Sequence, residues 1–210
     1  MIQEITLSET KPSVTRCHIL LDFQATLETK PEKAIKLEKD ALAQIENITA
    51  DNARLVSNLH ANLGGLYRMN GHPDLAREHM EKSISLLDQF NLLHINDSIP
   101  QIANYAMFLT EQQEPERGIS ELQKLSGIIK EYHSDDCLDY AKVQETLGTI
   151  YLMTANLPQA KTHFKRAFKI YEKIWADEPE MIEAKYQEIQ ELYPQIGFCI
   201  GKNLSGLLTK

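Results

Sequence analysis

The amino-acid sequence predicts an all-α protein built as a superhelical solenoid of antiparallel helix pairs, and two regularities carry this prediction. Pro31, Pro73 and Pro115 are 42 residues apart, and each opens a stretch of helical character. Proline suits the first turn of a helix because its missing N–H would have no partner there. The second regularity is a shared pattern around Gly64 and Gly148, which lie two such periods apart. Self-similarity at a fixed period is the sequence signature of a repeat architecture.

The composition is that of an ordinary globular protein, with 210 residues, 42% hydrophobic and 25% charged. A net charge of -8 disfavours nucleic acids and acidic membrane surfaces, because both bind basic protein faces. We therefore expect neither as a partner. The N-terminal residues do not resemble a signal peptide, and no apolar run approaches the roughly 20 residues of a membrane span, so we expect a cytoplasmic protein. Cys17, Cys137 and Cys199 are too widely spaced for a disulfide framework and are expected to be reduced, mostly buried thiols.

The expected elements follow the 42-residue period in order. Residues 1–14 are an N-terminal segment, residues 15–182 hold four helix pairs, and residues 183–210 hold a fifth first helix with a C-terminal capping segment. The second helix of each pair restarts at a proline, and Pro158 comes one place later than the period predicts, so the fourth turn should differ in detail. Helix starts are expected where side-chain oxygens can cap free N–H groups, as at Asp51 and in the stretch Ser-Asp-Asp at 134–136.

The repeated residues follow one pattern in two stretches of the chain. The first stretch holds Leu63, Gly64, Tyr67, Gly71, Ala76, Met80 and Ser83. The second stretch holds Leu147, Gly148, Tyr151, Ala155, Ala160, Phe164 and Ala167. This pattern resembles the tetratricopeptide repeat (TPR). Its unit is longer than the usual repeat of about 34 residues, and in this it is similar to the repeats of kinesin light chain and of peptide-sensing regulators from Gram-positive quorum systems.

The small residues of the pattern have a physical reason. Where the two helices of a pair cross, Gly64 or Ala76 lets the backbones approach closely, and Tyr67 or Phe164 fills the space beside them. Larger residues at the crossing would push the helices apart.

The chain offers no catalytic constellation and no metal-binding pattern. The HExxH motif, a phosphate-binding glycine loop and a nucleophile elbow are all missing from the sequence, and its histidines form no cluster with ligand spacing. His79 and His163 follow acidic or polar helix positions and are expected to be solvated. We therefore expect a protein that is not an enzyme and that has no cofactor or metal site.

The resemblance implies a concave groove lined by the first helix of each pair, with defined positions pointing inward. The peptide-binding residues expected from this register are Asn58, Asn62, Arg68, Met69, Asn104, Met107, Glu111, Lys142, Glu145, Thr146, Thr149 and Met153. The same register also places Ala61, Gly65, Pro100, Ala103, Thr110 and Leu152 at the groove.

Asn62 and Asn104 occupy the same inward position one period apart. An asparagine amide both donates and accepts hydrogen bonds, so two of them can hold the backbone of an extended peptide. The alternative is that these amides bond helix carbonyls or water in a wet groove. Met69, Met107 and Met153 are flexible thioethers, which favour an adaptable, apolar ligand.

One sharper form of the resemblance fails. The carboxylate clamp, by which some TPR proteins bind the acidic tail of a chaperone, requires lysine, arginine and asparagine at five positions. Asn104 and Lys142 fit, but Ala61, Gly65 and Thr146 stand at the other three. We therefore do not expect a chaperone-tail clamp.

Two further features lie outside the groove. Lys161, Lys165, Lys169 and Lys173 are spaced by four along one helix face, which is typical of solvated surface and less often of a site for an acidic partner. The tail at 196–208 carries six large apolar residues, so it either packs back as a cap or docks on a second copy or on further chain.

The sequence thus predicts a non-catalytic interaction module that binds an extended peptide or partner segment in its concave groove. The alternative is a structural or self-associating scaffold, forming a homodimer through the apolar tail, or the sensor half of a regulator that lacks its effector domain.

Overall fold

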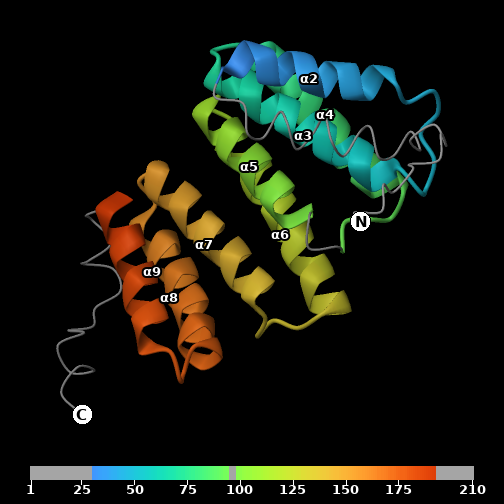
Figure 1. Cartoon of the computed structure of the whole chain (residues 1–210). Coiled ribbons are helices and arrows are strands. Elements are labelled where there is room, and N and C mark those ends of the chain that lie inside the picture. Colours follow the sequence, from blue (N-terminus) through green and yellow to red (C-terminus); the bar gives the residue numbers. More distant parts are fainter. Residues whose placement is uncertain (1–29, 95–97, 193–210) are drawn as a thin grey trace, which may run out of the picture. The chain divides into compact units, whose positions relative to one another are not determined.

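A computed structural model describes residues 30–94 and 98–192, and their regular structure is entirely helical. The helices are α2 (Pro31–Ala43), α3 (Ala53–Met69), α4 (Pro73–Gln89), α5 (Ser98–Glu111), α6 (Pro115–Tyr132), α7 (Leu138–Met153), α8 (Leu157–Ile174) and α9 (Pro179–Leu192) (Figure 1). The predicted all-α class is confirmed. The second helices of the first three predicted pairs begin at Pro31, Pro73 and Pro115, as expected.

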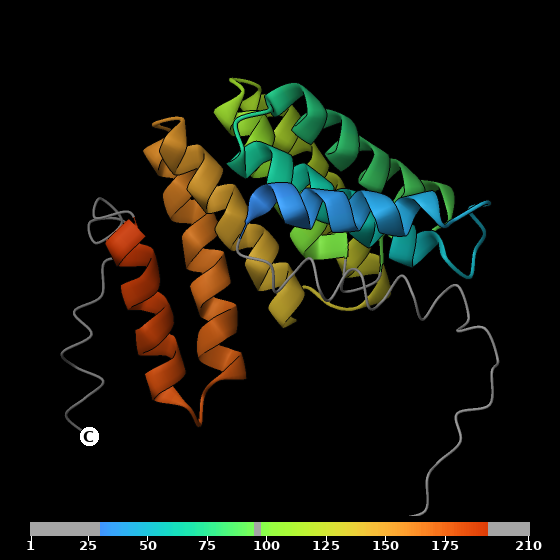
Figure 2. The same cartoon turned by 45° about the horizontal axis from the view of Figure 1, so that its top comes forward.

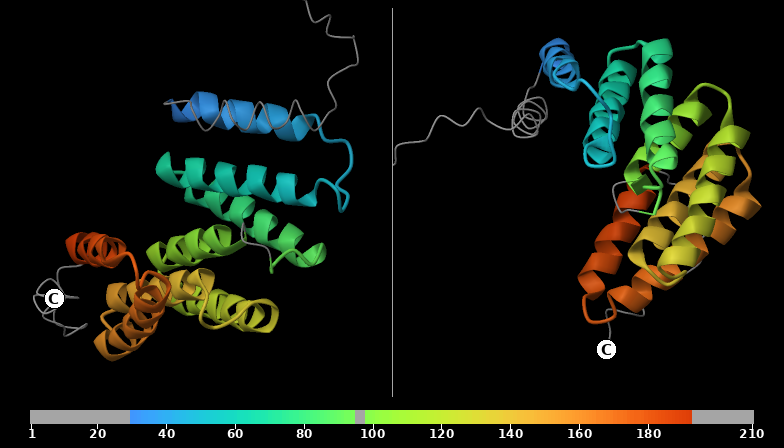
Figure 3. Two further views of the ribbon diagram at one scale, coloured as in Figure 1. Left: turned by 60° about the horizontal axis from the view of Figure 1, so that its bottom comes forward. Right: turned by 90° about the vertical axis from the view of Figure 1, so that its right-hand side faces the viewer.

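The chain divides into two compact units, residues 1–92 and 93–210. In the first unit α3 packs against both α2 and α4. In the second unit α7 packs against α5, α6 and α8, and α9 packs against α8. Figure 2 shows α7, α8 and α9 lying side by side, and Figure 3 shows the same ribbon from two further directions.

One turn geometry recurs in three hairpins and accounts for the 42-residue period. Gly71, Gln113 and Ala155 have φ angles of 75°, 65° and 59°, which lie in the left-handed region. In the first of these turns the N–H of His72 donates to the carbonyl of Tyr67 at 2.9 Å, and the equivalent bonds 42 and 84 residues later measure 2.8 and 2.7 Å. This is the Schellman ending, which satisfies the last carbonyls of a helix. The same ending then sets the start of each second helix.

The fourth turn differs in detail, as Pro158 suggests, although its second helix starts in period, 42 residues after Pro115. Helix α8 begins at Leu157, so Pro158 stands one residue inside the helix. The side-chain oxygen of Asn156 accepts a hydrogen bond from the N–H of Gln159 at 3.4 Å and caps the helix. The left-handed residue itself keeps its place in the period.

The close helix crossings predicted from the small residues are confirmed. A Cβ added at Gly64 would lie 2.5 Å from Cγ of Met80, and one added at Gly148 would lie 2.9 Å from the ring of Phe164. The tightest crossing against backbone is at Gly118 on α6, where an added Cβ would lie 2.6 Å from the carbonyl oxygen of Ala106 on α5. These contacts hold the two helices of each hairpin at their closest approach.

The expected helix caps are wrong in two places. The residue before α3 is Asn52, whose side chain does not cap the helix; its oxygen accepts a hydrogen bond from the N–H of Thr49 at 2.8 Å. At α7 the thiol of Cys137 takes the capping position and accepts from the N–H of Tyr140 at 3.4 Å. Cys137 is half-buried, which departs from the expected buried thiol, and the other two cysteines lie outside the described residues.

Alanine substitutions at two glycines of α6 should act in opposite directions. Gly118→Ala should lower the free energy of unfolding by about 2 kcal/mol or more, because its methyl group meets the backbone of α5. Gly127→Ala should raise it by about 0.5–1 kcal/mol, because a Cβ at Gly127 would enter open space and alanine favours the helix. Urea unfolding followed by circular dichroism measures both. Equal effects of the two variants would contradict the close crossing.

A matched pair of glycine substitutions tests the turn. Ala155→Gly should stabilise the protein by about 1 kcal/mol, since a left-handed conformation costs an L-residue roughly 1–2 kcal/mol. The same change at Ala184, in the interior of α9, should destabilise it by about 0.5–1 kcal/mol. Thermal unfolding of the two variants beside the parent chain measures the difference. A destabilised Ala155→Gly protein would rule out strain at this turn.

Candidate functional site

The second unit contains a groove of about 1000 Å³ formed by α5 and α7, the first helices of two successive hairpins, and by α9. Its lining residues are Ile99, Pro100, Ala103 and Asn104 on α5, Cys137 before α7, Leu138, Asp139, Lys142, Glu145 and Thr146 on α7, and Lys185 and Glu188 on α9. The groove is open to solvent and mixes apolar and charged side chains, so it can hold an extended ligand.

Six residues of the predicted register meet in this groove. They are Pro100, Ala103, Asn104, Lys142, Glu145 and Thr146. The other predicted residues of α5 and α7 do not line it, since Met107, Glu111, Thr149 and Met153 lie farther along the same helices. Only the N-terminal half of α5 and roughly the N-terminal half of α7 therefore line the groove.

Sequence reasoning missed the contribution of α9. Lys185 and Glu188 line the groove although they lie beyond the four predicted pairs. The period itself carried a signal for one of them, because Glu188 lies 42 residues after Thr146, which in turn lies 42 after Asn104. No repeat signal marks Lys185.

An ion-pair cluster joins α7 and α9 at one wall of the groove. The ammonium of Lys185 lies 3.0 Å from Oε1 of Glu145 and 3.1 Å from Oε2 of Glu188. Burial of Lys185 opposes its charge, but the two carboxylates together hold its pKa above the ordinary value. Lys185 therefore stays positively charged and is shared between two acids.

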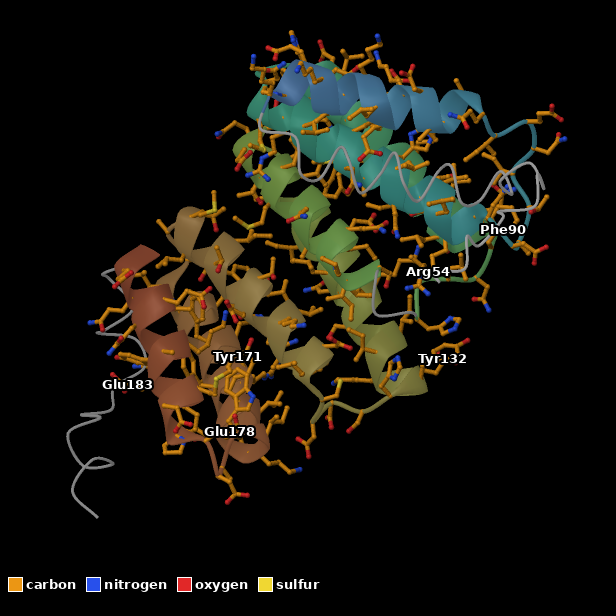
Figure 4. The ribbon with its side chains drawn as sticks, in the orientation of Figure 1. Arg54, Phe90, Tyr132, Tyr171, Glu178 and Glu183 are labelled. Carbon is orange, nitrogen blue, oxygen red and sulfur yellow. The ribbon has the colours of Figure 1, made fainter. Side chains whose placement is uncertain are left out.

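Tyr171 on α8 holds Glu145 from the other side. Its hydroxyl donates to Oε2 of Glu145 at 2.6 Å. Burial and the neighbouring carboxylate raise the pKa of Tyr171 well above its usual range, so the hydroxyl keeps its proton. Figure 4 labels Tyr171 in the region where α7, α8 and α9 run together. Two donors on different helices thus fix the Glu145 carboxylate.

The second lysine of the groove is also paired. Lys142 is exposed, and its ammonium lies 3.6 Å from Oδ1 of Asp139 one turn earlier. Such exposed pairs contribute little to stability but neutralise the local charge. The hydroxyl of Thr146 donates to the carbonyl of Lys142 at 2.9 Å, so toward a ligand this hydroxyl can only accept.

A smaller apolar pocket of about 280 Å³ opens beside the groove. It is lined by Leu138, Lys142, Tyr171, Trp175, Met181, Ala184, Lys185 and Glu188, of which Leu138, Lys142, Lys185 and Glu188 also line the groove. The rings of Tyr171 and Trp175 stack with 4.8 Å between centroids and 9° between planes. We call this cavity the side pocket.

A polar cluster lies inside each of two hairpins, at positions 84 residues apart. Between α7 and α8, Nδ1 of His163 donates to the side-chain oxygen of Gln144 at 2.9 Å, and the His163 ring stacks on Tyr151 at 5.2 Å. The expectation that His163 is solvated is wrong, because only 9% of the residue is exposed. Burial lowers its pKa, so the imidazole is held neutral.

The equivalent cluster between α3 and α4 contains two histidines. The Nδ1 atoms of His60 and His79 lie 2.8 Å apart, and the His79 ring stacks on Tyr67 at 5.4 Å. His79 is half-buried, so the expectation of a solvated side chain is wrong here too. Burial first, and then the neighbouring charges of His79 and Lys82, lowers the pKa of His60 to about 4. Burial also lowers the pKa of His79.

Comparison with known proteins identifies the repeat. Residues 98–173 match the family model described as "Tetratricopeptide repeat". This part of the chain is thus built of tetratricopeptide repeats. No curated protein matches it in sequence.

Solved structures with a similar fold include BtubC and a putative kinesin light chain with TPR-like repeats. BtubC (BKLC) from P. vanneervenii aligns with a TM-score of 0.63 and 21% identity over 76% of this chain and 63% of BtubC, so the chain spans less than two thirds of that protein. A putative kinesin light chain from Podosopora anserina with nearly identical TPR-like repeats aligns with a TM-score of 0.63 and 15% sequence identity. The alignment covers 80% of this chain and 79% of the Podosopora chain. A singly substituted form of the same Podosopora protein aligns with a TM-score of 0.66 and 15% sequence identity, and the alignment covers 81% of each chain. The long repeat is thus similar to that of kinesin light chain.

The predicted site residues of the first unit lie on α3. Asn58, Asn62 and Arg68 are half-buried, and Met69 is 82% exposed. The amide of Asn62 donates to Oε1 of Glu38 on α2 at 3.0 Å. The side chain of Asn62 therefore bonds a neighbouring helix of its own unit, and its contact with a ligand stays a prediction.

The remaining predicted features lie elsewhere. All four lysines of the stripe on α8 are exposed, and Lys173 pairs with Asp136. Within the described ranges 30–94 and 98–192, no three histidine, cysteine or acidic side chains are arranged to hold a metal ion, and no helix has the length and apolarity to cross a membrane. The apolar tail lies outside the described residues.

The two polar clusters predict how stability depends on pH. As the pH falls below 6.5, unfolded His60 takes up a proton while folded His60 stays neutral until about pH 4, so stability is full above 6.5 and is lost toward 4. The loss from His60 is at most about 3 kcal/mol, at 1.36 kcal/mol per pKa unit. His60→Gln copies the Gln144 cluster and should keep the bond to His79 while flattening this loss.

Urea unfolding at pH 8, 6.5 and 5 measures the effect, with the parent chain and His60→Gln compared at each pH. His163 is present in both proteins and provides the common background. Parallel stability curves for the two would show that His60 is not held neutral by the fold.

Proposed function

We propose that this protein is a non-catalytic interaction module and that its second unit binds an extended segment of a partner protein in the groove of α5, α7 and α9. TPR folds generally serve as protein–protein interaction modules. The observation that carries the proposal is the open groove of about 1000 Å³, where three successive first helices present polar and apolar side chains together.

The spacing of polar groups across the groove suits an extended chain. Asn104, Thr146 and Glu188 stand at one repeat position on three successive first helices. Packed helices lie roughly 8–10 Å apart, which is about three residues of extended peptide at around 3.3 Å each. A segment of about seven residues would therefore pass all three side chains.

The chemistry of these groups favours contact with a peptide backbone. The exposed amide of Asn104 offers one acceptor and two donors, whereas Thr146 and Glu188 offer acceptors. A β-like peptide presents alternating N–H and C=O groups, which such side chains can pair without reading the sequence. Affinity would then depend on main-chain bonds, and selectivity on the rest of the groove.

Asn104→Ala tests this proposal. A library of random twelve-residue peptides displayed on phage is selected on the full chain, and the enriched peptides are synthesised for fluorescence anisotropy. Asn104→Ala should weaken their binding by about 1–3 kcal/mol, because peptide groups buried in the groove lose their partner. Gln190→Ala, an exposed change on α9 away from the groove, is the control and should bind normally.

Two results would contradict the proposal: no enriched peptide, or equal affinity for the parent chain and Asn104→Ala. Asn62→Ala is a poorer test, because it also removes the hydrogen bond to Glu38 and so changes the stability of the first unit.

A further inference from the structure

We infer that the side pocket receives one large apolar side chain of the bound segment, and that a lysine or arginine adjacent to it in that segment faces Glu188. This inference rests on the proposed function, because the side pocket opens from the same groove. It names the chemistry of the partner, which the fold alone leaves open.

The size and lining of the side pocket suit an apolar side chain. Its volume of about 280 Å³ exceeds that of a leucine, methionine or aromatic side chain. Leu138, Trp175, Met181 and Ala184 give it apolar walls, and Met181 is 43% exposed. Burying an apolar side chain against these walls removes apolar surface of both molecules from water.

The pocket is held in shape before any ligand enters. Trp175 stacks face to face on Tyr171, and the Tyr171 hydroxyl is tied to Glu145 on α7. Glu145 in turn pairs with Lys185 on α9. The three helices that form the pocket are therefore linked through one chain of contacts, which lowers the cost of ordering on binding.

The charges at the mouth of the pocket favour a basic neighbour. Lys142 and Asp139 form one neutral pair, while Lys185 alone faces two carboxylates, Glu145 and Glu188. The lining thus carries three acids against two bases. Glu188 is the more exposed of the two acids on Lys185, at 57% against 19%, so the excess negative charge is accessible there.

An acidic segment does not fit this arrangement. Both lysines of the groove already contact carboxylates of the chain, so a ligand carboxylate would have to displace one of them. Complementary charge selects partners and disfavours those of like charge. The geometry therefore points to an apolar and basic segment rather than an acidic one.

Two variants test the inference on peptides selected from the same phage library. Ala184→Phe places a ring in the side pocket, and Gln190→Phe adds the same ring to an exposed site of α9 outside it. The enriched peptides should share a large apolar residue next to lysine or arginine. Ala184→Phe should weaken their binding about tenfold or more, the scale of losing a buried anchor side chain, and Gln190→Phe should not.

The charge is tested by Glu188→Gln, which keeps the shape of the side chain. It should weaken binding of the basic peptides about threefold to tenfold at low salt. It should also abolish the preference of the protein for these peptides over the same peptides with glutamine at the basic position.

A double-mutant cycle tests whether the peptide's apolar residue enters the side pocket. It pairs Ala184→Phe with alanine at that apolar residue, and the two losses of binding free energy should not add. Circular dichroism of each variant checks its fold. Met181→Ala enlarges the side pocket and is a second test, because it should shift the selected peptides toward bulkier apolar side chains.

The outcomes separate the two proposals. If Asn104→Ala weakens binding but Ala184→Phe and Glu188→Gln do not, peptide binding in the groove stands and the role of the side pocket is overturned. Selection of acidic peptides, or of peptides without a common apolar residue, also overturns it. If no peptide is enriched, or if Asn104→Ala binds equally well, the groove proposal fails and this inference fails with it.

Discussion

The two helices of a hairpin in this protein can approach closely only where one of them carries little or no side chain. At Gly118 the carbonyl of Ala106 occupies the space that a Cβ would need, and at Gly148 a phenylalanine ring occupies it. A hairpin closed at this distance needs a tight connection. The left-handed residues at 71, 113 and 155 supply it, even where the residue is glutamine or alanine. The crossing and the turn together fix where each second helix begins.

The closed hairpin also determines what its polar residues can do. His163 and Gln144 face each other between α7 and α8, and His60 and His79 do so between α3 and α4. Buried polar groups must be paired, so each cluster completes its hydrogen bond inside the hairpin and covers the imidazole with a tyrosine ring. The partner of the histidine on the second helix is an amide in one hairpin, Gln144, and a second imidazole in the other, His60. Only the second arrangement places two titratable imidazoles in contact, so the hairpins differ in their response to acid.

The sequence was sufficient for those features that repeat along the chain. The period, the proline starts and the small residues at the crossings are local patterns, and the structure contains them where they were predicted. The inward register, which the family resemblance implied, includes six residues that line the groove, and their contact with a ligand stays a prediction. The sequence was insufficient where a partner lies far along the chain. His79 is preceded by Glu78 and looks like part of an exposed face, yet its partner lies 19 residues earlier on the neighbouring helix. Lys185 reaches Glu145 because α9 packs in the second unit, and no regular spacing in the sequence predicts this contact.

The ion pairs of the groove matter more for what they exclude than for the stability they give. Exposed pairs contribute little free energy, and salt screens them. Glu145, however, is largely buried and receives one hydrogen bond from Tyr171 and one ion pair from Lys185. A ligand that drew Lys185 away would leave this largely buried carboxylate without its cation, which is costly. Lys185 is therefore committed to its own chain, and Glu188 is the more exposed of its two carboxylate partners. Under the proposed function, selectivity at this surface would follow from an ion pair within the chain that also lines the groove.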